Sequence, residues 1–342
     1  MRVLVLLFVG LLAGAGWVPA SATPSASADP NLPVDACVMN DKRLNELSGL
    51  VADADHWYAI NDGGTKSTVY VLSKECTVEK VISGPTDPYD VEDLARSADG
   101  TFWLSDTGDN DKKRTTVALI ALTPAGKTTL YRLTYPDGPH DTEALLLDKN
   151  NVPYLIAKNP LGVADIYRPA GALASPGPTA LEHVGAIHLT STQTPGGPIP
   201  PLVGSVTVTG AASTADGSVV AVRTYTDAYL YPVPDGDLLA ALGKQPLRVG
   251  LPNEKQGEAV AFEPNGALLS ASEGVGQPIR VLAGAADLVA PKPAPAAGKG
   301  ETDGAPAEAP ARKAGLPTLP AIGLTVAILL VFLLFARRRK RT

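Results

Sequence analysis

Short apolar runs separated by polar turns fill the middle of the chain. The runs are rich in Val, Ile, Leu, Tyr and Trp, and each predicts a β-strand; they cover residues 57–60, 68–72, 101–104, 117–122, 128–133, 153–157, 218–222, 228–231, 267–270 and 279–282. Asp-Gly or Asn-Gly dipeptides at residues 99, 216 and 265 favour hairpin turns, because these residue types tolerate positive φ. Only residues 237–242 favour a short helix. We therefore predict an all-β domain over residues 35–286.

The hairpin turns also reveal a repeat. Counting seven residues back from each turn gives Glu92, Thr209 and Glu258, and the same count from Asn150 and Asp53, which no Gly follows, gives Glu143 and Glu46. The spacings between these five positions are 46, 51, 66 and 49 residues. Repeats of this length with four short strands are typical of β-propeller blades.

We predict a propeller of five blades. The last repeat has room for only three strands, and the segment at residues 37–42 is expected to supply the fourth and close the ring. A sixth blade is the alternative, because the long third repeat leaves room for one between Ile166 and Ser205. A β-sandwich also contains many short strands, but it does not explain one frame that recurs five times.

Both ends of the chain have compositions that differ from this domain. Residues 1–28 combine Arg2, an apolar run and small residues at two cleavage positions, as in a signal peptide. Residues 287–315 are rich in Pro, Ala and Gly and predict an extended stalk. Residues 316–336 are free of charge and long enough for a transmembrane helix, and residues 337–342 form a basic tail. The domain is then expected outside the cell membrane, with the C-terminus in the cytoplasm.

Charge and cysteine content fit that location. Without Arg2 and the five basic tail residues, 23 Lys and Arg remain against 35 Asp and Glu. Such an acidic domain is unsuited to nucleic acid, whose phosphates need a basic surface. An unknown envelope component or small molecule is the expected ligand. The two cysteines, Cys37 and Cys76, are predicted to form a disulfide, which an oxidising compartment allows.

Acidic residues at equivalent repeat positions are the main candidate site. The first strand of a propeller blade lines the central channel, so Glu46, Glu92, Glu143 and Glu258 are expected to converge. Ionised carboxylates held close together repel one another and favour a bound cation. Ca²⁺ suits an oxygen-rich set of this kind. The alternative is that each glutamate caps backbone amides of the neighbouring blade.

Further candidates lie fourteen to sixteen residues after these positions, at the end of the second strand. Asp62 and Asp106 can add metal ligands, whereas Lys158 and Arg223 can line the channel and neutralise part of its charge. The polar loop that follows Asp106 is expected at the channel mouth. His140 stands three residues before Glu143 and is a weak candidate for acid or base catalysis, since an exposed loop histidine is the simpler interpretation.

Several segments carry a family resemblance. They begin at Asp90 (DVEDLA), Ser105 (SDTGDN), Tyr135 (YPDGPHDTE) and Gly257 (GEAVA). They resemble secreted bacterial β-propellers similar to the esterase-like phytase domain and, more distantly, to gluconolactonase and regucalcin propellers. The resemblance implies a divalent metal held by acidic channel residues at positions 46, 92, 143 and 258. Thr209, Lys158 and Arg223 depart from an all-acidic channel.

Two functions are compatible with these features. The first is a membrane-anchored binding or scaffold module with Ca²⁺ in the channel. The second is a metal-dependent hydrolase of lactones or phosphate esters, in which the ion activates water. Motifs for serine hydrolases, zinc proteases and P-loop nucleotide binding do not occur in the sequence.

Overall fold

The computed structural model describes residues 32–289, and this part of the chain is all-β. It contains twenty strands, the short helices α1 (Pro201–Gly204) and α2 (Leu238–Leu242), and the 3-10 turns η1 (Lys42–Leu44) and η2 (Ala286–Leu288). The Asp237 side chain caps α2 by accepting from the amide of Ala240. The short helix expected at residues 237–242 is therefore confirmed.

The strands form five antiparallel units of four. The first two units contain β2 (Leu47–Ala52), β3 (Trp57–Asn61), β4 (Ser67–Leu72), β5 (Val78–Gly84), and β6 (Val91–Arg96), β7 (Phe102–Asp106), β8 (Val117–Leu122), β9 (Thr128–Thr134). The third and fourth contain β10 (Thr142–Leu147), β11 (Pro153–Ala157), β12 (Val163–Pro169), β13 (Thr179–His188), and β14 (Val208–Ser213), β15 (Val219–Thr224), β16 (Asp227–Pro232), β17 (Leu247–Gly250). The fifth contains β18 (Gly257–Phe262), β19 (Leu268–Ser272), β20 (Gln277–Leu282) and β1 (Val34–Met39). A short parallel contact joins β13 to β9.

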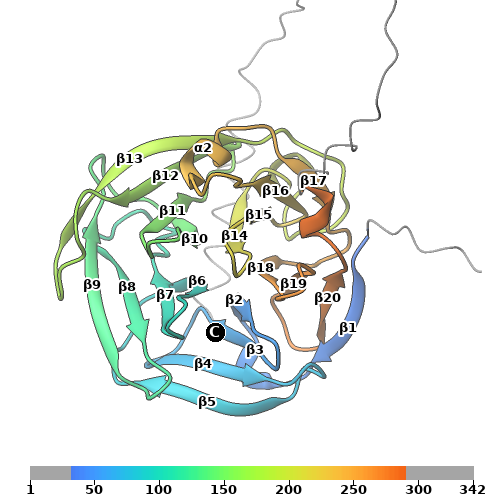
Figure 1. Cartoon of the computed structure of the whole chain (residues 1–342), viewed down its shortest axis with the longest axis horizontal. Coiled ribbons are helices and arrows are strands. Elements are labelled where there is room, and N and C mark those ends of the chain that lie inside the picture. Colours follow the sequence, from blue (N-terminus) through green and yellow to red (C-terminus); the bar gives the residue numbers. More distant parts are fainter. Residues whose placement is uncertain (1–31, 290–342) are drawn as a thin grey trace, which may run out of the picture. The chain divides into compact units, whose positions relative to one another are not determined.

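The five units are arranged in a ring, which is consistent with a β-propeller (Figure 1). Their first strands, β2, β6, β10, β14 and β18, lie innermost, and each contacts the next until β18 returns to β2. The segment from Ile166 to Ser205, which left room for a sixth unit, holds the end of β12, all of β13 and the helix α1 instead. The strands described here thus make five units.

The N-terminal strand closes the ring. β1 pairs antiparallel with β20, so the first described strand completes the last unit, as predicted. Cys37 on β1 forms a disulfide with Cys76, which lies in the turn between β4 and β5. The disulfide therefore links the fifth unit to the first.

Apolar side chains fill each space between neighbouring units. One buried cluster lies between each pair, for example around Tyr58 and Phe102 between the first and second units. The other four clusters contain residues from units two and three, three and four, four and five, and five and one. Burial of these side chains is the main source of stability, and it leaves polar groups to the channel and the loops.

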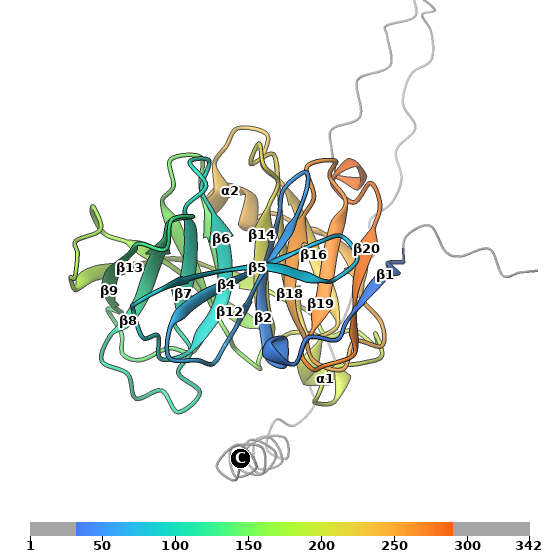
Figure 2. The same ribbon diagram turned by 90° about the horizontal axis from the view of Figure 1, so that it is seen from below.

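The alternating strand directions define two faces of the ring. All five first strands begin on one face, which we call the entry face. The connections between second and third strands, and those between units, lie on the same face because the strands are antiparallel. Figure 2 shows α1 and η1 on this face and α2 on the opposite one.

The expected ends of the chain fall outside this range. The signal peptide at residues 1–28, the transmembrane helix at 316–336 and the basic tail at 337–342 lie outside the described residues, as does almost all of the stalk at 287–315. Within residues 32–289, no helix has both the length and the hydrophobicity needed to cross a membrane.

Candidate functional site

A β-bulge near the start of every first strand determines which side chains occupy the channel end. The pairing with the second strand shifts by one residue in β2, β6, β10, β14 and β18. A bulge leaves one residue out of the ladder and redirects its side chain. The bulged residues are Ser48, Glu92, Glu143, Thr209 and Glu258.

This register corrects the repeat frame in the first unit. Ser48, and not Glu46, is the counterpart of the three glutamates. The frame fails there because Asp53 corresponds to Ser97, which precedes the turn, and not to Asp99 within it. The amide of Asp53 donates across its turn to the carbonyl of His56. The amide of Ser97 donates in the same way to the carbonyl of Thr101. Glu46 was therefore placed two residues out of register.

Glu46 lies two residues before the bulged residue of its strand, as Asp90 and Gln256 do in theirs. The amides of these three residues donate to a side chain at the end of the second strand, at 2.9, 2.9 and 2.8 Å. The Glu46 side chain is half-buried. The predicted ring of four glutamates is thus a set of three, with Ser48 and Thr209 in the remaining places.

The two hydroxyls at bulged positions bind the backbone of the next unit. Ser48 Oγ donates to the carbonyl of Glu92 at 2.7 Å, and Thr209 Oγ1 donates to the carbonyl of Gly257 at 2.8 Å. They therefore join neighbouring first strands, whereas the glutamates leave their charge in the channel.

The channel-mouth cluster is formed by Glu92, Asp141 and Glu143. Each offers a carboxylate oxygen, and these three oxygens all lie within 4.8 Å of one another. The three residues are between 2% and 7% exposed. Buried carboxylates at this separation cannot all remain ionised without a compensating positive charge.

The electrostatics of the cluster reflect this crowding. Burial, followed by the charge of Glu143, raises the pKa of Glu92 well above its ordinary value. Burial also raises the pKa of Glu143 to about 7, against the opposing effect of Lys158. Glu258 has a raised pKa for the same reasons, burial first and then Glu143. The cluster therefore favours protons or a bound cation at neutral pH.

Lys158 is the cation within this group. Its ammonium forms an ion pair with Glu143 and lies 5.8 Å from the centre of the Tyr225 ring. Although burial opposes the charged form, Glu143, Tyr225 and other acidic groups hold the pKa of Lys158 well above its ordinary value. The structure thus places Lys158 beside Glu143, in a position to neutralise part of the charge.

The loop after β7 packs against the cluster. The amide of Asp109 donates to Asp141 Oδ1 at 2.8 Å. A side chain at Gly108 would collide with the carboxylates of Glu92 and Asp90, so only glycine leaves room for both groups. Arg114 holds the loop in place through the Gly108 carbonyl at 2.8 Å.

Below the cluster, Asp93 occupies the channel. It is fully buried, and its carboxylate accepts from the amides of Leu94, Leu145 and Ala211 at 2.8, 2.7 and 3.1 Å. Burial raises the pKa of Asp93 well above its ordinary value, although these amides lower it. Asp93 connects three first strands, which no pattern in the sequence indicated.

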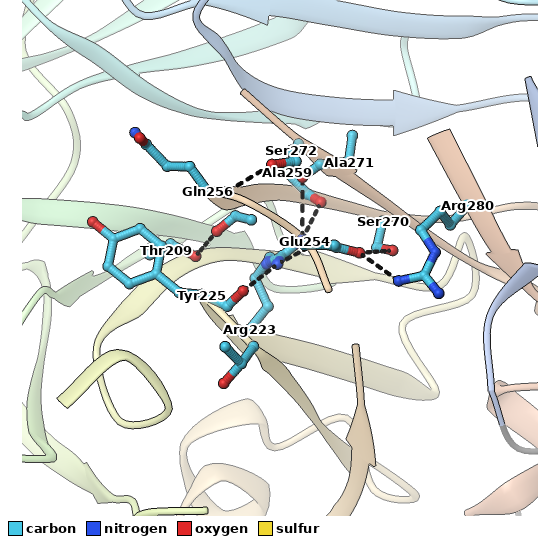
Figure 3. Close-up of polar contacts among 12 residues, drawn as sticks. Thr209, Arg223, Tyr225, Glu254, Gln256, Ala259, Ser270, Ala271, Ser272 and Arg280 are labelled. Atoms are coloured by element: carbon cyan, nitrogen blue, oxygen red, sulfur yellow. Dashed lines mark hydrogen bonds and ion pairs between the residues drawn. The ribbon is translucent and has the colours of Figure 1, made fainter. Parts of the chain in front are cut away.

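Arg223 lies away from the cluster. It is completely buried between the fourth and fifth units, where it bonds Glu254 Oε2 at 2.7 Å and also donates to backbone carbonyls, including that of Ala259 at 2.9 Å. Figure 3 shows Arg223 and Arg280 approaching Glu254 from two sides. The prediction that Arg223 lines the channel is corrected: its guanidinium is committed to Glu254, which sequence reasoning missed.

The two aspartates proposed as extra ligands occupy different positions. Asp106 Oδ1 accepts from the amides of Tyr89 and Asp90 and from Arg114, so this side chain organises the loops around the entry face. Asp62 is half-buried, and its amide bonds the Glu46 carbonyl at 3.0 Å. Neither belongs to the three-carboxylate cluster found among the described residues.

His140 forms a separate polar group on the side of the third unit. Its Nε2 lies 2.9 Å from Asp137 Oδ1 and 2.9 Å from the Tyr167 hydroxyl. Tyr135 packs edge-on against its ring, and the Tyr135 hydroxyl bonds Thr142. His140 is thus engaged with Asp137 and Tyr167 instead of with Glu143.

No protein-family model and no curated protein sequence matches the chain. Solved structures similar to it include glutaminyl cyclase from Myxococcus xanthus, at 13% identity and a TM-score of 0.42, covering 73% of this chain and 95% of that one. Virginiamycin B lyase from Staphylococcus aureus has 12% identity and a TM-score of 0.35, covering 70% and 66%. A protein assigned as a gluconolactonase has 15% identity and a TM-score of 0.38, covering 66% and 70%. At these values the likenesses do not bear on function.

Proposed function

We propose that the chain is a five-bladed β-propeller that binds a divalent metal ion, Ca²⁺ in the first place, at the channel-mouth cluster. The observation that carries this proposal is the approach of Glu92, Asp141 and Glu143 oxygens to within 4.8 Å of one another in a buried setting. A divalent cation neutralises such a set without requiring protonation. The cluster is then a recognition site presented on the entry face.

The donor atoms favour a hard cation. All three candidate ligands are carboxylates, and the cluster contains neither His nor Cys among the described residues. Ca²⁺ and Mg²⁺ take oxygen ligands, whereas zinc sites commonly use His or Cys. Asp90 lies beside Glu92 across Gly108, which gives a flexible Ca²⁺ site a further carboxylate. Ca²⁺ also tolerates irregular ligand geometry better than Mg²⁺ does.

Metal binding is tested on the purified domain spanning the described residues, with its disulfide intact. We expect a Ca²⁺-dependent rise in melting temperature and a stoichiometric calorimetric signal, both lost in Glu92→Gln. Glu46→Gln is the matched control, because Glu46 is acidic, lies on the same face and is outside the cluster. Identical behaviour of wild type and Glu92→Gln towards Ca²⁺, Mg²⁺ and Mn²⁺ would rule out the site.

The binding module is proposed to be exported and anchored in the cell membrane, with the C-terminus in the cytoplasm. The signal-peptide and transmembrane patterns in the sequence support this location, and the Cys37–Cys76 disulfide is compatible with an oxidising compartment. Protease treatment of intact cells should then digest the domain and leave a short membrane-bound fragment. Protection of the domain in intact cells would contradict the proposed orientation.

A metal-dependent hydrolase of lactones or phosphate esters is the second candidate. It is favoured by one observation, the carboxyl group of Glu143 with its pKa raised to about 7 beside the Lys158 ammonium. A carboxylate with a pKa near neutrality suits general base catalysis, and a bound divalent ion would supply the activation of water. Lys158 would then orient Glu143.

The two candidates are separated by turnover measurements. The metal-loaded domain is incubated with a panel of aliphatic lactones and aryl phosphates, and product is followed by pH-stat titration or absorbance. Hydrolysis that is lost in Glu143→Gln and retained in Glu46→Gln establishes the enzyme. If the domain binds metal but hydrolyses neither the lactones nor the phosphates, the binding module is the supported function.

A further inference from the structure

One carboxylate oxygen beside the cluster has no partner. Glu258 is 4% exposed, and its Oε1 accepts from Gln256 Nε2 at 3.3 Å. Its Oε2 is buried and has no hydrogen-bond partner among the described residues. A buried acceptor that lost its hydrogen bonds to water costs free energy unless a donor replaces them.

The neighbouring donors are already engaged. Lys158 directs its ammonium to Glu143. Arg223 is held by Glu254 and by backbone carbonyls. Gln256 donates to the other oxygen of Glu258. None of these three side chains donates to Glu258 Oε2, so a ligand that brings its own donor can satisfy this oxygen.

The charge around this oxygen remains negative even with an ion in the cluster. Burial raises the pKa of the Glu258 carboxyl group most, and the charges of Glu143 and Glu273 raise it further, whereas Lys158 and Arg223 act in the opposite direction. A divalent ion bound by Glu92, Asp141 and Glu143 offsets the charge of two carboxylates. Glu258, Glu273 and Asp90 still contribute negative charge to the same end of the channel, which disfavours an anionic ligand.

We propose that Glu258 Oε2 binds the ammonium group of a small organic ligand, next to the ion in the channel-mouth cluster. This inference deepens the proposed function, because the ion and the ammonium would share one recognition site. A primary ammonium has three N–H donors and a full positive charge, so it satisfies Glu258 Oε2 and benefits from Glu273 at the same time. A second metal ion would need more oxygen ligands than Glu258 and Glu273 offer.

The narrow surroundings limit the size of the cationic group. Glu258 and Glu143 are both at least nine-tenths buried, and the face of Tyr225 is near Lys158. Such buried surroundings favour an unbranched alkylammonium over a quaternary ammonium, which is bulkier and has no N–H donor for Glu258 Oε2. The bond from Gln256 to Glu258 is long, at 3.3 Å, so we expect the Gln256 side chain to move when the ligand enters.

The probe is n-butylammonium, compared with n-butanol and butyrate of similar size. Binding to the purified domain is measured by calorimetry and ligand-observed NMR, once with saturating Ca²⁺ and once with EDTA. We expect saturable binding of butylammonium only, weakened about tenfold or more in Glu258→Gln by loss of the charge-assisted bond. Glu46→Gln is the matched control and should bind as wild type does.

Two variants separate this inference from metal binding. Glu258→Gln should keep the Ca²⁺ response, whereas Glu92→Gln should lose it and retain butylammonium binding. Should Glu258→Gln fail to fold, Glu273→Gln is used and is expected to weaken butylammonium binding several-fold with Ca²⁺ binding unchanged. Equal binding of butylammonium and butanol, or full affinity in the folded Glu258 or Glu273 variant, would overturn the ammonium site while leaving the metal site intact.

Discussion

The Lys158 ammonium is paired with the Glu143 carboxylate inside the channel-mouth cluster. The same carboxyl group belongs to the three that approach within 4.8 Å. Lys158 and a divalent ion therefore compete for Glu143, although both reduce the repulsion among the acids. This relationship makes the lysine a resident counter-charge of the metal-free protein.

Replacing Lys158 should separate these two effects. In EDTA, Lys158→Met is expected to lower the free energy of unfolding by about 3 kcal/mol, because a buried carboxylate loses its partner. Saturating Ca²⁺ should restore most of that loss, and the affinity for Ca²⁺ should rise. Urea denaturation with and without Ca²⁺ measures both. If the substitution lowered the affinity for Ca²⁺, Lys158 and the ion would not be competing for Glu143.

Gly108 should affect the site far more than the fold. The nearest atoms that a methyl group there would meet belong to the ends of the Glu92 and Asp90 side chains, and these carboxylates can move away. We expect Gly108→Ala to reduce Ca²⁺ affinity about tenfold, as disturbed ligand positioning does, with little change in melting temperature in EDTA. Gly171→Ala, which meets open space, is the control.

Stability of the metal-free protein should fall as pH rises. Glu143 has a pKa raised from 4.5 to about 7, so the folded state keeps a proton that the unfolded chain has released. This contribution is fully present below about pH 4.5 and is lost as pH rises towards 7 and beyond, amounting to roughly 3 kcal/mol. The raised pKa values of Glu92 and Glu258 act in the same direction.

The pH effect is checked by urea denaturation in EDTA at pH 5, 6, 7 and 8. Glu143→Gln should flatten the profile, because the amide does not titrate. Saturating Ca²⁺ should also reduce the loss of stability at high pH, since the ion binds the ionised carboxylates. A profile that rises from pH 5 to 7 in EDTA would show that the cluster is not buried as described.

Arg223 should be essential for stability without being needed for metal binding. Arg223→Met leaves Glu254 buried without its closest cationic partner and is expected to cost about 3–5 kcal/mol. The double variant with Glu254→Gln should recover part of the loss, as coupled partners do in a double-mutant cycle. Urea denaturation gives the free energies. Additive effects of the two substitutions would argue against the pair.

The disulfide should contribute to ring closure. Cys37 and Cys76 are 39 residues apart in the sequence, and removal of a cross-link over such a loop costs about 3–4 kcal/mol through the entropy of the unfolded chain. We expect the double Cys→Ser variant to melt several degrees lower and to be insensitive to reductant. Wild type treated with reductant is the matched comparison, and it should approach the variant.

Much of the fold was predictable because it depends on local patterns. Short strands, Asp-Gly turns and a repeat near 50 residues sufficed for an all-β ring of five units, and for closure by the N-terminal strand. Glu92, Glu143 and Glu258 were found because each precedes its turn by the same count. Glu46 was misplaced because the count began at Asp53, which corresponds to Ser97 before the turn and not to Asp99 within it.

The remaining site residues depend on contacts between distant segments. Asp93 binds amides 52 and 118 residues away, so its role appears only once the ring is formed. Arg223 finds its acidic partner 31 residues further on, in the connection between units. Asp141 lies two residues before Glu143 in the sequence, but its approach to Glu92 depends on how the second and third units pack.

The closure of the ring by β1 has a consequence for biosynthesis. The partner of β1 is β20, so the first of the described strands must wait for the last of them before its backbone groups can pair. During that time β1 is an unpaired edge, exposed to pairing with other chains. A nascent chain that stops before β20 contains the four units from β2 to β17, but it lacks the strand with which β1 pairs to close the ring. Closure of the ring thus waits for β20, the last strand of the described residues.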